Sequence, residues 1–193
     1  FFMPFYLQGV AGYSPGATGG IMMTNALGMI IAGPLAGRLS DRFGTKTFNV
    51  VGSLVAASGV FVLANITIES SLPFLLVGVI LPSWGMGIFS APNTSSILKA
   101  APRSSYGATA GFLQLLRNGS TVTGIAIGTL VVAAAISAAG LHANLRGFTE
   151  GVDSNTAEAF VTGLQTLFLS VGVLQITGAV ISLMSPSGAE PTT

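Results

Sequence analysis

The chain has 193 residues, of which 50% are hydrophobic and only 7% are charged, and its formal net charge at pH 7 is +1. Soluble domains average about 25% charged residues, so this composition excludes an ordinary soluble protein. The seven Lys and Arg residues are spread along the chain rather than gathered into one basic face, which excludes a nucleic-acid-binding protein.

Apolar runs divide the chain into six predicted membrane helices. The first, residues 1–12, covers only about half a bilayer. It begins without an initiator Met, so we expect that the chain enters partway through a membrane helix and that an N-terminal portion precedes it. The other runs are long enough to cross about 30 Å of hydrocarbon as helices. They are residues 16–36, 47–66, 73–95, 107–137 and 160–184.

These runs predict an all-α membrane protein in which residues 1–184 form one six-helix transmembrane bundle. Residues 185–193 contain Pro, Gly, Ser and Thr with one charge, and we expect them to form a disordered cytoplasmic tail.

Positive charge sets the expected orientation in the membrane. The basic residues of the predicted loops 37–46 and 96–106 are Arg38, Arg42, Lys46, Lys99 and Arg103. The connections that alternate with these loops carry little positive charge, and short loops rich in Lys and Arg stay in the cytoplasm. We therefore expect both loops on the cytoplasmic side of a plasma membrane, the inner membrane of a bacterium.

The first of these loops reads Gly-Arg-Leu-Ser-Asp-Arg-Phe-Gly-Thr-Lys. Gly37 allows two helix ends to approach, and Gly44 permits a backbone φ that other residues resist. Asp41 can accept hydrogen bonds from the free N–H groups of a helix N-terminus, where the helix dipole favours a carboxylate. Arg42 and Lys46 can bind that carboxylate or an anionic lipid. The alternative is a loop whose charges only set the topology.

The spacing of these residues resembles the signature inter-helix loop of major facilitator superfamily transporters. The resemblance implies that the loop is a conformational latch: Asp41 pairs with cationic groups and a helix end, and the pairing breaks when the two halves of the transporter rock. The family pattern usually has a basic residue directly after the second Gly, where this chain has Thr45.

Two further segments resemble the fourteen-span drug/proton antiporter branch of that superfamily. They are the opening Phe5–Val10 with Gly12–Pro15, and the run Arg117–Ser120 with Gly124–Ala126. The resemblance covers residues 1–184 and implies the C-terminal half of a major facilitator fold, whose partner is an N-terminal transmembrane bundle. It also implies proton-coupled efflux of drugs or other amphipathic compounds by alternating access.

A polar stripe marks the run 107–137. Gln114, Asn118 and Thr121 fall at i, i+4 and i+7, beside Arg117. A charge in hydrocarbon costs at least about 2.5–3.5 kcal/mol on insertion scales, so Arg117 should face protein or water. It is a cation of a substrate pathway, a partner for an acid in the N-terminal half, or a side chain that extends to the cytoplasmic surface.

Polar and aromatic side chains in other runs complete the expected substrate pathway. Asn and Gln side chains, and the hydroxyl of Thr94, interrupt the apolar runs. Aromatic rings supply contacts for a bulky ligand. The alternative for each is a helix–helix hydrogen bond or packing against lipid. The full set of candidates is Gln8, Asn25, Trp84, Phe89, Asn93, Gln114, Arg117 and Asn118.

Groups for catalysis or metal binding are scarce. The chain has no cysteine and one histidine, His142, and its six Asp and Glu residues all fall in predicted loops or at span ends. We therefore expect no metal, no cofactor and no enzyme activity. Because no carboxylate lies deep in a span, we expect the carboxylate that couples protons to transport in the N-terminal half.

Three functions remain open. The first is proton-coupled efflux of amphipathic small molecules, with protons, the substrate and the lipid bilayer as partners. The second is a facilitator or symporter of a sugar or other small metabolite, which the polar stripe on the run 107–137 allows. The third is a membrane remnant that transports nothing.

Overall fold

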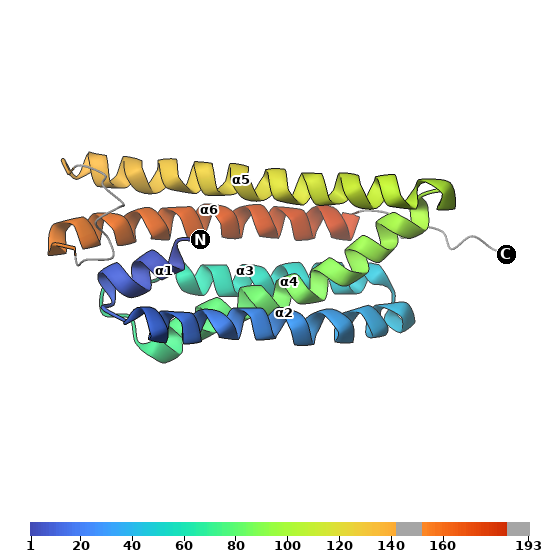
Figure 1. The fold of residues 1–193 in the computed structure, drawn as a ribbon, viewed down its shortest axis with the longest axis horizontal. Helices are drawn as coiled ribbons and strands as arrows, with labels where there is room; N and C mark the ends of the chain where they lie inside the picture. The colour runs from blue at the N-terminus through green and yellow to red at the C-terminus, as the bar shows by residue number, and fades with distance from the viewer. Residues whose placement is uncertain (142–151, 185–193) are drawn as a thin grey trace.

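The computed structural model describes residues 1–141 and 152–184, and this part of the chain is helical, with turns between the helices and no strand. In chain order the elements are α1 (Met3–Phe5), the π-helical turn η1 (Tyr6–Val10), α2 (Pro15–Phe43), α3 (Thr45–Leu63), α4 (Leu72–Ala100), the 3-10 turn η2 (Arg103–Ser105), α5 (Tyr106–Ala138) and α6 (Ser154–Met184) (Figure 1). His142 and the tail 185–193 lie outside the described residues.

Five helical segments of the described residues are long and apolar enough to cross a membrane: α2, α3, α4, η2 with α5, and α6. The prediction of an all-α chain with several membrane helices therefore holds for this part of the protein. The expected first span, residues 1–12, corresponds to α1 and η1, which have three and five residues. A bundle of six crossing helices remains a prediction.

The loops at the charged end are shorter than predicted. The loop expected over 37–46 is wrong, because α2 continues to Phe43 and α3 starts at Thr45. No residue of the run 38–43 interrupts helical hydrogen bonding, and the chain turns at Gly44, whose φ of +85° suits glycine. The loop expected over 96–106 is likewise wrong in its bounds, since α4 extends to Ala100 and ends before Pro102.

The long helices pack side by side in the order α2, α4, α3, α6, α5 (Figure 1). Contacts between α3 and α6 include the ring of Phe61, which lies against Gly172. On α5, Gly128, Val132 and Ile136 are buried, whereas most residues before Gly128 are exposed. The first part of α5 therefore stands away from its neighbours and faces α4 across open space.

Glycine brings α3 and α4 into contact through bare backbone. A Cβ atom on Gly52 of α3 would lie 2.8 Å from the carbonyl oxygen of Gly85. A Cβ atom on Gly85 of α4 would lie 2.5 Å from the carbonyl oxygen of Gly52. Both distances are below what a carbon side chain tolerates, so this packing requires glycine at both positions. Close approach through small residues is typical of membrane helices.

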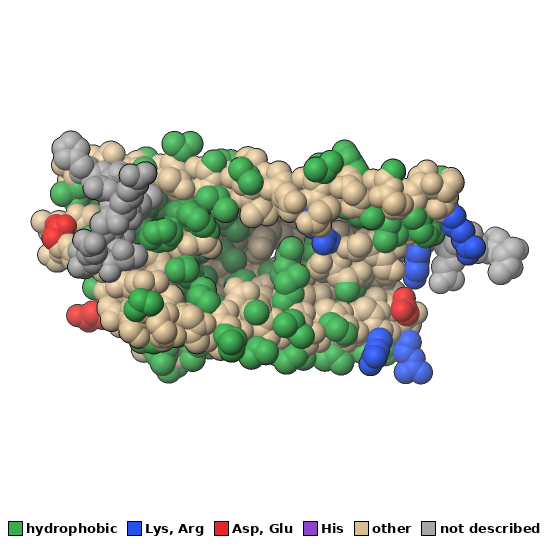
Figure 2. All heavy atoms as spheres, viewed as in Figure 1, with side chains coloured by type: hydrophobic (Ala, Val, Ile, Leu, Met, Phe, Trp, Pro, Cys, Tyr) green, Lys and Arg blue, Asp and Glu red, His purple; other side chains and the backbone are tan. Residues whose placement is uncertain are grey.

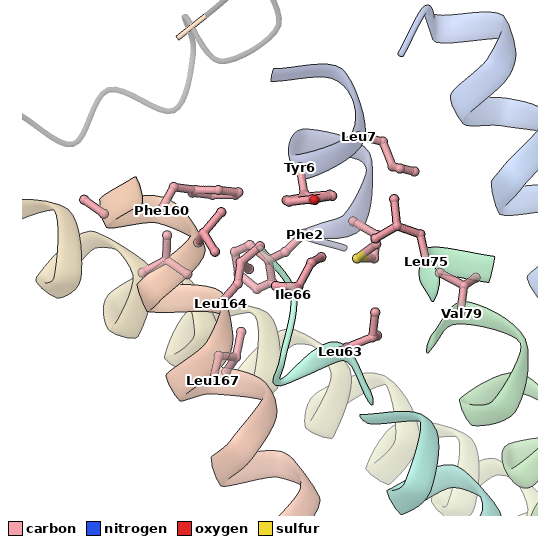
Figure 3. Close-up of a cluster of buried hydrophobic side chains, with 14 of the residues drawn as sticks. Phe2, Tyr6, Leu7, Leu63, Ile66, Leu75, Val79, Phe160, Leu164 and Leu167 are labelled. Carbon is pink, nitrogen blue, oxygen red and sulfur yellow. The ribbon is translucent and has the colours of Figure 1, made fainter. Parts of the chain in front are cut away.

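An apolar cluster joins the helices at one end of the bundle. Phe2, Tyr6 and Leu7 at the start of the chain are buried in a cluster that also contains side chains of α2, α3, α4, α5 and α6 and of the turn after α3 (Figure 3). Those partners include Ile66, Leu75, Phe160 and Leu164. Tyr6 Oη also donates a hydrogen bond to the carbonyl of Thr67. The bundle is thus closed at this end.

The opposite end of the bundle is cationic. Most of the Lys and Arg side chains of the described residues gather where α2 and α4 finish, and most Asp and Glu side chains lie at the other end (Figure 2). The two loops expected in the cytoplasm therefore share one end of the molecule, as the prediction of membrane orientation requires.

We predict that Gly85→Ala lowers the thermal stability of the full-length protein in detergent, because the added methyl group meets the backbone of α3. Overpacking of this kind costs about 1–3 kcal/mol. Gly111→Ala is the matched control, since a Cβ atom there meets nothing within 4 Å. Unfolding temperatures measure both effects, and equal temperatures for the two variants would contradict the packing described for α3 and α4.

Candidate functional site

A cleft of about 550 Å³ opens between α2 and α4, close to the start of α5. Figure 2 shows the molecule hollowed between the upper and lower helices. Small-molecule sites have volumes of about 300–1,000 Å³ and apolar walls with a few polar groups. The cleft fits this description, and its lining residues are Met29, Gly33, Gly87, Ser90, Ala91, Thr94, Ser95, Leu98, Lys99 and Tyr106.

Arg117 of α5 reaches across to the α4 wall of this cleft. Its Nη2 donates a hydrogen bond of 2.6 Å to Thr94 Oγ1 and a longer one of 3.4 Å to Ser90 Oγ. Thr94 Oγ1 in turn donates to the carbonyl oxygen of Ser90 at 2.8 Å. Arg117 lies about 16 Å along the helix axis from the first residue of α5. Its charge therefore lies at the edge of the cleft and contacts α4.

The charge of Arg117 has no carboxylate partner among residues 1–141 and 152–184. In that part of the chain, Asp41 pairs with Lys99, and Glu69 and Glu158 belong to the opposite end of the bundle. Hydrogen bonds to hydroxyl groups replace part of the lost hydration of a guanidinium and leave its charge uncompensated. The edge of the cleft is thus a cationic site.

The amides of the polar stripe lie on the same helix as Arg117. Gln114 Nε2 donates a hydrogen bond of 3.1 Å to Asn118 Oδ1, and both residues are exposed. Thr121 Oγ1 donates to the carbonyl oxygen of Arg117 at 2.9 Å. Within the described residues, the amide groups of Gln114 and Asn118 bond to each other and to no other helix.

Two aromatic candidates occupy different sides of α4. A Cβ atom on Gly28 would lie 2.7 Å from Trp84 Cδ1, so the Trp84 ring packs against α2. Phe89 lies where α4 touches α3, because a Cβ atom on Gly52 would meet the Phe89 backbone nitrogen at 2.7 Å. Neither ring lines the cleft.

The remaining amide candidates are separated from Arg117. Asn93 follows Phe89 by one helical turn and is half-buried on the same side of α4. Gln8 is half-buried on η1, at the end of the bundle that the apolar cluster closes. Asn25 is exposed on α2, one turn before Gly28. The structure thus brings Arg117 to the cleft and leaves these three residues outside its lining.

The expected latch residues lie at the cationic end. Lys99 Nζ of α4 lies 3.4 Å from Asp41 Oδ1 of α2, and the two side chains are 66% and 64% exposed. An exposed ion pair contributes only about 0–1 kcal/mol. This contact therefore joins α2 to α4 by a bond that breaks easily.

The other residues of the latch sequence surround that ion pair. Gly37 faces Ala91 of α4, where an added Cβ atom would make an ordinary contact of 3.8 Å. Arg42 is exposed in the last turn of α2, and Lys46 is half-buried in the first turn of α3. Gly44 is the one residue between those helices.

Sequence reasoning did not assign Lys99 or Ser90 to the site. Lys99 was expected to set membrane topology, and Ser90 carried no prediction. A usable signal was present: Ser90, Thr94 and Leu98 are spaced by four residues and therefore share one face of α4. The same spacing extends this face close to Lys99.

Comparison with known proteins identifies the family. The family model described as Major Facilitator Superfamily matches residues 1–186. The chain is 34% identical over 126 residues to the riboflavin transporter RibZ of Clostridioides difficile. The aligned region covers 65% of this chain and 28% of RibZ.

Two other relatives match a similar region. The uncharacterized transporter YebQ of Escherichia coli is 31% identical over 130 residues, which is 67% of this chain and 28% of YebQ. The multidrug transporter protein MdtP of Bacillus subtilis is 26% identical over 117 residues, which is 61% of this chain and 22% of MdtP. The aligned region thus spans between 22% and 28% of these relatives.

The match over residues 1–186 confirms the resemblance at the level of the superfamily. This chain belongs to the major facilitator superfamily, a superfamily of membrane transporters, rather than to a family of enzymes. Together with its apolar helices, this membership makes it a multi-pass membrane protein.

We predict that Thr94→Val frees the Arg117 guanidinium from α4, because the shorter of its two hydrogen bonds is lost. Thr129→Val is the matched control: Thr129 Oγ1 donates to the Ile125 carbonyl at 2.8 Å and, in the part of the chain that the structure describes, has no partner on another helix. The measurement is the rate at which phenylglyoxal modifies Arg117, read by mass spectrometry. The rate should rise at least about twofold in Thr94→Val and stay unchanged in Thr129→Val; equal rates would contradict the contact.

Proposed function

We propose that this chain is the C-terminal half of a secondary active transporter that exports amphipathic small molecules by alternating access, driven by protons. The observation that carries the proposal is the cleft of about 550 Å³ with the guanidinium of Arg117, from a helix long and apolar enough to cross a membrane, at its edge. Ionisable groups inside membrane spans are rare and typically mark substrate or ion pathways. Membership of a transporter superfamily supports the same conclusion.

The two ends of the bundle support a direction of transport. The apolar cluster around Tyr6 and Phe160 closes one end, whereas Lys99 and Tyr106 line the cleft at the other. We propose that the cationic end faces the cytoplasm, so that a compound enters the cleft from there. Rocking against an N-terminal bundle then exposes it to the opposite side.

Proton coupling requires a group that binds and releases a proton within the membrane. The described spans hold no Asp or Glu away from their ends. We propose that the coupling carboxylate belongs to an N-terminal bundle and that the present helices contribute the wall of the cleft and the latch.

The ion pair of Asp41 and Lys99 is the proposed latch. It joins α2 to α4 at the mouth of the cleft, and Lys99 itself lines the cleft. A pair worth only about 0–1 kcal/mol breaks and reforms without a large barrier. We propose that it is formed in one transport state and broken in the other.

A second function is supported by one comparison. RibZ, which is 34% identical over the aligned region, is named a riboflavin transporter. Movement of a small metabolite, by facilitation or symport, is therefore the alternative for this chain. The polar contacts of Arg117 with Ser90 and Thr94 suit a ligand with hydrogen-bonding groups.

Transport by the full-length protein in liposomes separates these functions. We predict that the amphipathic dye 8-anilinonaphthalene-1-sulfonate moves across the liposome membrane when a pH gradient is imposed and that a protonophore abolishes this movement. Riboflavin serves as the metabolite probe. If riboflavin moved without a pH gradient and the dye did not move, the function would be facilitated transport of a metabolite instead of efflux.

We predict that Asp41→Asn slows transport several-fold without reducing the amount of protein in the membrane, because the ion pair with Lys99 is lost. The exchange of both charges, Asp41→Lys with Lys99→Asp, should restore much of the rate. Arg38→Gln is the control, because it removes a charge from the same end of α2. A normal transport rate in Asp41→Asn, or no recovery in the exchanged pair, would exclude the latch.

A further inference from the structure

We infer that the cleft edge at Arg117 recognises the anionic group of an amphipathic ligand, a carboxylate or a similar oxyanion. The inference rests on the proposed function only in treating this cleft as the path of a ligand. It adds the chemical class of the ligand and the residue that selects it.

The guanidinium of Arg117 has hydrogen-bond donors to spare. Its Nη2 serves Thr94 and Ser90, and its Nε and Nη1 have no acceptor within residues 1–141 and 152–184. A guanidinium presents its donors as a planar fork that matches the two oxygens of a carboxylate. The two hydroxyls fix one arm of the fork on α4 and leave the others for a ligand.

Both hydroxyls beside the guanidinium also line the cleft. Thr94 Oγ1 already donates its proton to the Ser90 carbonyl and accepts from Arg117. Among the described residues, Ser90 Oγ has only the longer contact with Arg117, so its own hydroxyl proton is available to an acceptor. An oxyanion at this position would thus receive hydrogen bonds from α5 and from α4.

A second cation and the charge at the mouth favour the same ligand. Lys99 lines the cleft, about 7.5 Å further along α4 than Thr94. Asp41 is the acid at that end within the described residues, and the cations there are Arg38, Arg42, Lys46, Lys99 and Arg103. Five cations against one acid leave this end with a net positive charge, although Lys99 pairs with Asp41, and such a field raises the local concentration of anions.

The rest of the cleft suits an apolar body. Met29, Leu98 and Tyr106 supply apolar surface, and Gly33 adds no side chain to the lining. A ligand with a hydrocarbon or aromatic portion can bury that portion here while its charged group reaches Arg117. This combination defines an amphipathic anion rather than a lipophilic cation or a neutral polar compound.

The test compares two probes that share the dansyl group and the hydrocarbon chain, 11-(dansylamino)undecanoic acid, which is an anion, and its methyl ester, which has no charge. Both are bound to the full-length protein in nanodiscs. Dansyl fluorescence gives both dissociation constants. We expect the acid to bind the unchanged protein at least about tenfold more tightly than the ester.

Arg117→Gln should reduce acid binding to the level of the ester and leave ester binding unchanged, while Arg117→Lys should retain part of the preference. Arg38→Gln removes one of the five cations at that end but none that lines the cleft, so it should retain most of the preference.

Two results would overturn the inference. Equal binding of acid and ester to the unchanged protein would show that the cleft does not select an anion. Loss of thermal stability in Arg117→Gln, combined with an unchanged preference for the acid, would show that Arg117 pairs with a carboxylate of the protein itself. Because these are binding measurements, a protein that prefers the acid but does not move 8-anilinonaphthalene-1-sulfonate would contradict the proposed function and leave this inference standing.

Discussion

The contact of α3 with α4 through bare backbone at Gly52 and Gly85 positions the rest of the described bundle. In a membrane, helices associate through close packing and hydrogen bonds, because lipid tails are as apolar as the side chains. Two glycines allow that packing where larger residues would hold the helices apart. With one side of α4 fixed on α3, its other faces present Ser90 and Thr94 toward α5 and Lys99 toward α2.

The contacts of the bundle differ in strength from one end to the other. At one end buried apolar side chains of several segments interlock and make many van der Waals contacts. At the other end α2 and α4 are joined by an exposed ion pair, and α5 touches α4 through polar groups. Regions with few buried apolar contacts open first. The cationic end is thus where a structural change costs least.

Much of this arrangement could be predicted from the sequence. Apolar runs and the clustering of Lys and Arg define the long helices and place the two basic turns at one end. The bounds of the turns at 37–46 and 96–106 were not predictable from charge, because charged residues continue a helix that has already formed. The partners of Arg117 and Asp41 were also not predictable, since Thr94 and Lys99 are distant in sequence and meet them only after α4 has packed between its neighbours.

Gly44 has a mechanical consequence for the two helices that it joins. It is the one non-helical residue between α2 and α3, and its backbone is turned to a φ of +85°. A connection of one residue allows little independent movement, so a tilt of α2 also displaces α3. Asp41 lies three residues before Gly44, and a displacement of either helix therefore changes its position relative to α4.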